Sequence, residues 1–111
     1  MKTDTEGKDS LEQLRLALAA FADERDWQQF HSPKNLSMAL IVEAAELVEH
    51  FQWLKEEQCY PLADEKLEEV RLELADILIY LVRIADRLGV DPVVAAFDKM
   101  QINADRFPVK K

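Results

Sequence analysis

The sequence has few residues that break helices or cross-link a chain. Its 111 residues include two glycines, four prolines and a single cysteine, Cys59, which excludes an intrachain disulfide framework. An all-β fold would need many more turn residues, so this scarcity favours long helices and an all-α fold. Charges interrupt the apolar stretches well before the ~20 residues that a membrane span requires. Because residues 1–9 also lack the apolar run of a signal peptide, we expect a cytoplasmic protein.

Positive charge is also scarce. Asp and Glu number 22 against 14 Lys and Arg, for a formal charge of −8. This excess repels nucleic acids and anionic membranes, so we expect neither as a partner. A polyphosphate would be repelled as well, unless a cation lies between it and the acidic groups. Any phosphate chemistry in this protein therefore requires a metal.

Apolar residues recur at helical spacing in four segments, and we expect helices over 11–26, 34–55, 65–88 and 92–106. The residues expected to cap them are Ser10 with Gln13 as a capping box, Ser32, Asp64, Gly89 and Asp91. Residues 10–108 would form one domain with tails at 1–9 and 109–111. Four such helices pack as an antiparallel four-helix bundle. Residues 72–85 of the third helix are apolar on most sides, so we expect other subunits to cover this helix in an oligomer.

Two pairs of acidic residues interrupt apolar helix faces. Glu43 lies within the apolar stripe of the second helix, and Glu46 lies one turn later at the edge of the same face. In the third helix, Glu73 and Asp76 fall within residues 72–85, where the only other charge is Arg83. Partly desolvated carboxylates are costly unless they are neutralised. Oxygen ligands without thiolates or clustered imidazoles favour Mg²⁺ over zinc.

Other readings of these acids remain open. They could instead form buried salt bridges with Arg71, Arg83 and lysines. A di-iron carboxylate bundle would use Glu-x-x-His motifs, and the sequence has none. His50, four residues after Glu46, could lie near the acids or be a bystander.

Further candidates are cationic and aromatic. On the fourth helix Lys99, Asn103 and Arg106 share one face, which could bind phosphates or simply be a solvated surface favoured by the helix dipole. The aromatic candidates for contacts with a base, or alternatively for core packing, are Trp27, His31, Trp53 and Tyr80.

The order of these motifs resembles a known family. The stretches FADERDWQQFHSPKNL, VEAAELVEHFQW, LADILIYLVRIADR and VDPVVAAFDKMQIN are similar to those of the all-α nucleoside triphosphate pyrophosphohydrolases of the MazG-like superfamily, and within it to the dCTP pyrophosphatases. The resemblance implies hydrolysis of dCTP or a modified pyrimidine deoxynucleotide to the monophosphate and pyrophosphate, in a homotetramer with sites between subunits.

The resemblance also assigns roles. The implied magnesium ligands are Glu43, Glu46, Glu73 and Asp76, and Glu46 is our candidate for the general base. The implied nucleotide pocket contains Trp27, His31, Trp53, Tyr80, Lys99 and Asn103, to which the cationic face adds Arg106. Leu18 stands where the animal enzymes carry a base-contacting histidine. The rival hypothesis is a non-catalytic acidic helical module that regulates or binds a basic partner, and its acids would face solvent.

Overall fold

The structure is a computed structural model and describes residues 9–110, which contain helices and turns but no strand. Four α-helices follow one another, as predicted: α1 (Ser10–Glu24), α2 (Pro33–Glu49), α3 (Asp64–Leu88) and α4 (Pro92–Arg106). Short 3-10 turns, η1 (Gln28–Phe30) and η2 (Glu56–Gln58), lie in the connections before α2 and before α3. No helix of this described part combines the length and the apolar character needed to cross a membrane.

Several predicted helix ends are confirmed. The Ser32 side chain accepts a hydrogen bond from the Asn35 amide at the start of α2. Asp91 accepts from the amides of Val93 and Val94 at the start of α4. Gly89 ends α3 with a φ of 70°, the left-handed conformation in which glycine has no steric penalty.

Three local predictions are wrong. Asp9, which we placed in a tail, is the N-cap of α1 and accepts from the Glu12 amide, so Ser10 is already helical and forms no capping box. A carboxylate one residue earlier competes for the same amides. Asp64 is the first residue of α3 rather than its cap. The second helix ends at Glu49 rather than at residue 55, because residues 50–54 form successive turns. The rest of the predicted N-terminal tail, and residue 111, lie outside the described residues.

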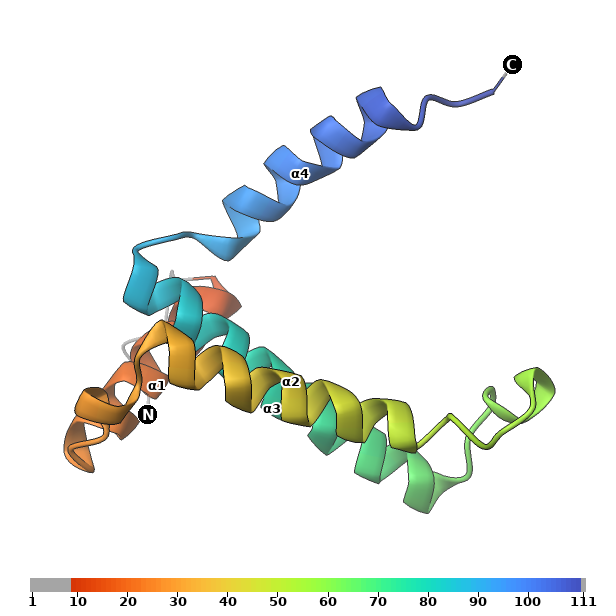
Figure 1. The fold of residues 1–111 in the computed structure, drawn as a ribbon, viewed down its shortest axis with the longest axis horizontal. Helices are drawn as coiled ribbons and strands as arrows, with labels where there is room; N and C mark the ends of the chain where they lie inside the picture. Colours follow the sequence, from red (N-terminus) through yellow and green to blue (C-terminus); the bar gives the residue numbers. More distant parts are fainter. Residues whose placement is uncertain (1–8, 111) are drawn as a thin grey trace.

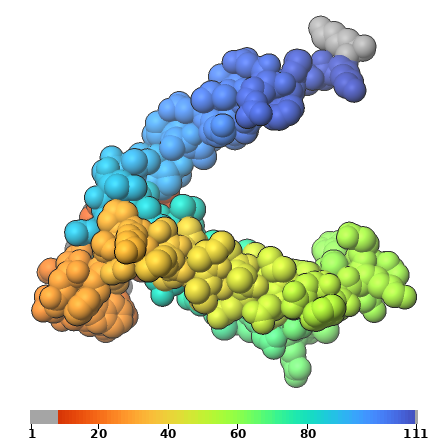
Figure 2. All heavy atoms as spheres, viewed as in Figure 1, coloured from red at the N-terminus to blue at the C-terminus, as the bar shows by residue number. Residues whose placement is uncertain are grey.

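The helices α2 and α3 pack side by side in antiparallel directions, and α1 packs against α3 (Figure 1). Leu36, Val82 and Ala85 are among the few buried apolar residues of these helices. The helix α4 instead extends away from α3 as a separate arm, as Figure 2 also shows. The predicted closed four-helix bundle is therefore not formed by one chain.

The open shape leaves much apolar surface in contact with solvent. The radius of gyration is 17.3 Å, whereas a compact domain of this length would have about 13 Å. On α4, Val94, Phe97 and Met100 are each more than half exposed. Exposed apolar patches of this kind mark surfaces that contact another protein chain, a membrane or a ligand.

Candidate functional site

Three carboxylates from two helices meet in one cluster. Glu43 of α2 and Glu73 and Asp76 of α3 each provide an oxygen within 4.8 Å of the others. The antiparallel packing of α2 and α3 produces this meeting, because it sets the middle of one helix against the middle of the other. Glu43 is half-buried and Asp76 is exposed. One oxygen of Glu73, Oε2, is buried without a hydrogen-bond partner within the described part of the chain.

The cluster is electrostatically unfavourable as it stands. Burial, together with Asp76 and the negative charges of Glu46 and Glu73, raises the pKa of Glu43 from about 4.5 to about 7. Burial and the neighbouring Glu46 also raise the pKa of Glu73. A group of buried or half-buried acids with raised pKa values favours either protonation or the binding of a cation.

The basic residues that could neutralise the acids are engaged elsewhere. Arg71 pairs with Glu68, at 2.8 Å between Nε and Oε2. The guanidinium of Arg83 donates to His31, Asp86 and Gln28, as described below. Within the described residues the alternative of buried salt bridges to these two arginines is therefore not realised. Three carboxylates with an unpartnered buried oxygen fit a hard divalent cation, whose preferred ligands are such oxygens.

Glu46 lies beside this group without belonging to it. It is exposed on α2, one turn after Glu43, and its charge contributes to the raised pKa values of both Glu43 and Glu73. Glu46 therefore lies near the three carboxylates and remains accessible to water. Glu49 is also exposed, at the C-terminal end of α2.

A cavity of about 260 Å³ adjoins the acidic cluster, and Asp76 belongs to both. Its wall includes Trp27, His31 and Tyr80, three of the predicted nucleotide contacts, brought together from the α1–α2 connection and from α3. The Trp27 ring lies edge-on to Phe21, with ring centroids 5.6 Å apart, and 6.1 Å from the His31 ring. This volume is below the ~300 Å³ lower limit of pockets for drug-sized ligands, so it suits one flat ring.

Arg83 is the residue of this cavity whose role the sequence analysis missed. We considered it as a counter-ion for the acids, whereas it is only 3% exposed and donates from Nε to Nδ1 of His31 at 3.3 Å. Its other nitrogens donate to Gln28 Oε1 at 2.8 Å and to Asp86 Oδ2 at 3.3 Å. The signal in the sequence was a single arginine inside an apolar segment, which indicates burial but not its partners.

The remaining predicted site residues do not line this cavity. Trp53 lies in the turns after α2 and is 87% exposed. Lys99, Asn103 and Arg106 lie on α4, the arm that projects away from α2 and α3. His50 belongs to neither group: its Nδ1 lies 3.3 Å from Nζ of Lys66.

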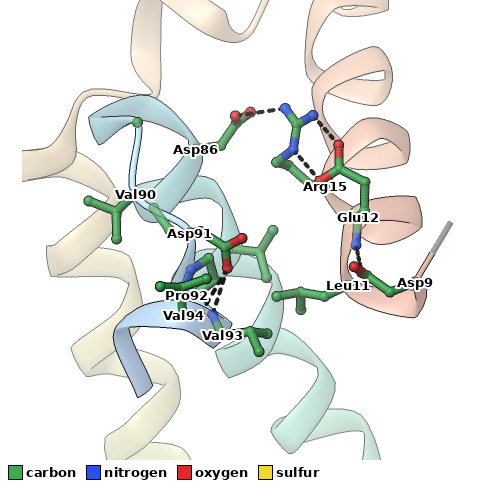
Figure 3. Close-up of a pocket in the computed structure, with 13 residues that line it drawn as sticks. Asp9, Leu11, Glu12, Arg15, Asp86, Val90, Asp91, Pro92, Val93 and Val94 are labelled. Atoms are coloured by element: carbon green, nitrogen blue, oxygen red, sulfur yellow. Dashed lines mark hydrogen bonds and ion pairs between the residues drawn. The ribbon is translucent and has the colours of Figure 1, made fainter. Parts of the chain in front are cut away.

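A larger cavity of about 450 Å³ lies elsewhere, where the start of α1, the end of α3 and the start of α4 meet. Its polar groups are already satisfied: Arg15 bridges Glu12 and Asp86, and Asp91 caps α4 (Figure 3). It contains neither the acidic cluster nor an aromatic residue. The smaller cavity beside the three carboxylates is therefore the candidate site.

Comparisons with known proteins converge on one family. The model of the MazG-like family matches residues 38–111. The chain is 49% identical over 102 residues to dCTP pyrophosphatase 1 of Bos taurus and 46% identical over 101 residues to that of Homo sapiens. These two matches cover 90% and 89% of this chain. It spans only about 60% of the length of these relatives.

A solved structure is also similar. The crystal structure of a pyrophosphatase from Archaeoglobus fulgidus matches with a TM-score of 0.76 and 36% sequence identity. The match covers 91% of this chain and 94% of that one.

Proposed function

Because the chain belongs to the MazG-like family, we propose that it is a magnesium-dependent nucleoside triphosphate pyrophosphohydrolase that converts dCTP, or a modified pyrimidine deoxynucleotide, to the monophosphate and pyrophosphate. The observation that carries this proposal is the carboxylate cluster of Glu43, Glu73 and Asp76, which shares Asp76 with a cavity of the size of one ring. A triphosphate with its metal would lie on the acids while its base enters the cavity.

The reaction is attack of water on the α-phosphorus. A bond forms between the water oxygen and the phosphorus, the bond to the bridging oxygen breaks, and pyrophosphate leaves with its electron pair. A bound divalent cation would offset the charge of phosphates and carboxylates and lower the pKa of a bound water. We assign Glu46 as the group that accepts the proton of the attacking water, because it lies beside the other acids and remains exposed.

Selection of the base would combine stacking and hydrogen bonding. Stacking on the Trp27 ring tolerates any base, so discrimination needs a polar contact with the ring edge. His31 can make one, whereas Leu18, which also lines the cavity, cannot. We therefore propose a preference for pyrimidine deoxynucleotides led by dCTP.

We further propose that the complete site forms between subunits of a homotetramer. The exposed apolar face of α4 needs a cover, and residues of the predicted phosphate-binding face lie on the same helix. Trp53, Lys99, Asn103 and Arg106 would then contact a nucleotide bound in a neighbouring subunit. A chain that remains monomeric at micromolar concentration by light scattering would overturn this assembly.

The direct test is a panel of common and modified nucleoside triphosphates, scored for pyrophosphate release with and without Mg²⁺. We expect hydrolysis led by dCTP that stops in excess chelator and returns when Mg²⁺ is restored. A purine preference would refute the assignment of the base. Hydrolysis that is undiminished by chelation would refute the metal. The absence of pyrophosphate release from every triphosphate would favour the non-catalytic acidic module.

A further inference from the structure

Two arginines of α3 hold His31 at two separate atoms. Nε of Arg83 donates to the ring nitrogen Nδ1 at 3.3 Å, and Nε of Arg87 donates to the backbone carbonyl oxygen of His31 at 3.1 Å. His31 itself directly follows η1, so both contacts join the α1–α2 connection to α3. The ring and the backbone of His31 are therefore fixed independently.

The contact with Arg83 determines where the ring proton lies. A guanidinium carries five N–H donors and no acceptor, so the histidine nitrogen that faces it must offer a lone pair. Nδ1 is therefore unprotonated, and a neutral ring carries its proton on Nε2. Burial and the positive charges of Arg83 and Arg87 lower the pKa of His31, which keeps the ring neutral. Among the described residues the hydrogen bonds of His31 involve Nδ1 and the backbone oxygen, and Nε2 has no hydrogen-bond partner.

Arg83 cannot easily turn away from this contact, because its remaining nitrogens are also engaged. One donates to Gln28 Oε1 at 2.8 Å and another to Asp86 Oδ2 at 3.3 Å. Asp86 is held in turn by Arg15, at 3.1 Å. A side chain with 3% exposure and three fixed partners has one arrangement available.

We propose that Arg83 is a positioning residue that fixes His31 in the Nε2–H tautomer, so that the cavity beside Trp27 offers the base a hydrogen-bond donor and not an acceptor. The proposal rests on the proposed function and specifies its substrate class. The edge of the base that faces His31 must carry an acceptor, which means a ring nitrogen or a carbonyl oxygen. An exocyclic amino group at that position would leave two donors facing each other and would be rejected.

The tautomer can be measured in the free protein by ¹⁵N NMR of histidine-labelled chains. Only two histidines occur, so a His50→Gln variant assigns both sets of signals. We expect long-range correlations at neutral pH that identify Nδ1 of His31 as unprotonated and Nε2 as protonated. An Nδ1–H tautomer, or a charged ring at neutral pH, would overturn the proposal. This result does not depend on any activity, so it is separable from failure of the proposed function.

The effect on substrate selection is tested with Arg83→Met, and Arg71→Met is the matched control because Arg71 is an exposed arginine of the same helix, paired with Glu68. We expect a mixture of His31 tautomers in Arg83→Met and a KM for dCTP raised about threefold to tenfold, the worth of one hydrogen bond. The kcat should remain near that of the parent. Arg71→Met should match the parent in all three measurements.

A double variant separates positioning from a merely structural role. If Arg83 acts through His31, then Arg83→Met should add little to the KM of His31→Ala, and the two effects should not multiply. Independent, multiplicative effects would overturn the proposal. Arg83→Lys keeps a donor but loses the planar fork, and we expect it to restore part of the tautomer preference. If Arg83→Met does not fold, as judged by circular dichroism, the Arg83→Lys variant and the tautomer of the parent protein decide the question.

Discussion

Removing one carboxylate from the acidic cluster should stabilise the metal-free protein, whereas the loss of a buried polar contact usually destabilises a fold. In the metal-free protein, Glu43 has a pKa raised to about 7 by burial and by the neighbouring acids. A carboxyl whose pKa is higher in the folded than in the unfolded state destabilises the fold when it ionises. The free energy of unfolding should therefore fall as the pH rises from about 4.5 to about 7, and stay low above that.

The magnitude follows from the same shift. Each tenfold difference in proton affinity between the folded and unfolded states corresponds to about 1.4 kcal/mol. The rise in the pKa of Glu43 from about 4.5 to about 7 therefore limits the loss of unfolding free energy to about 3 kcal/mol. Because the cluster is partly open to solvent, screening reduces this to about 1 kcal/mol. The variant Glu43→Gln removes the ionisable group, so at pH 8 and without metal it should be more stable than the parent by about that amount.

The assay is urea denaturation followed by circular dichroism, in chelator and in excess Mg²⁺, at pH 8 and at pH 4.5. We expect Glu43→Gln to exceed the parent only at pH 8 in chelator, and added Mg²⁺ to stabilise the parent more than the variant. Glu49→Gln, an exposed change on the same helix, is the control and should match the parent throughout. A Glu43→Gln protein that is no more stable than the parent at pH 8 without metal would refute the electrostatic reasoning.

Three further predictions concern activity and folding. Glu46→Gln, Glu73→Gln and Asp76→Asn should each lower kcat/KM by about 100-fold, measured as pyrophosphate release, whereas an equal loss in Glu49→Gln would mean that the wrong face of α2 was assigned. Leu36→Ala, which empties a side chain with 2% exposure, should cost about 3 kcal/mol of unfolding free energy in urea, and a loss below about 1 kcal/mol would contradict its place in the core. Gly89→Ala should cost about 1 kcal/mol, because its φ of 70° disfavours a Cβ although no neighbour lies within 4 Å, and unchanged stability would contradict this backbone argument.

The sequence by itself determined the four helices and the neighbouring positions of the acids within one helix. Helix segments follow from local periodicity and from caps such as Ser32 and Asp91, which depend on residues only a few positions away. The start of α1, which sequence misplaced, depends on a competition between Asp9 and Ser10 for the same amides, whereas α3 begins after Ala63 without any side-chain cap. The spacing of Glu73 and Asp76 likewise places both on one face of a helix before any packing is known.

Only the tertiary structure decided what those groups face. The antiparallel packing of α2 on α3 brings Glu43 to Glu73 and Asp76, and it directs Arg83 to His31 rather than to the acids. Such contacts join residues separated by 30 to 52 positions, for which the sequence contains no local signal. The direction of α4 was also decided only by the tertiary structure. Its periodicity predicted a helix, but an apolar helix face can be covered equally well by its own chain or by another subunit.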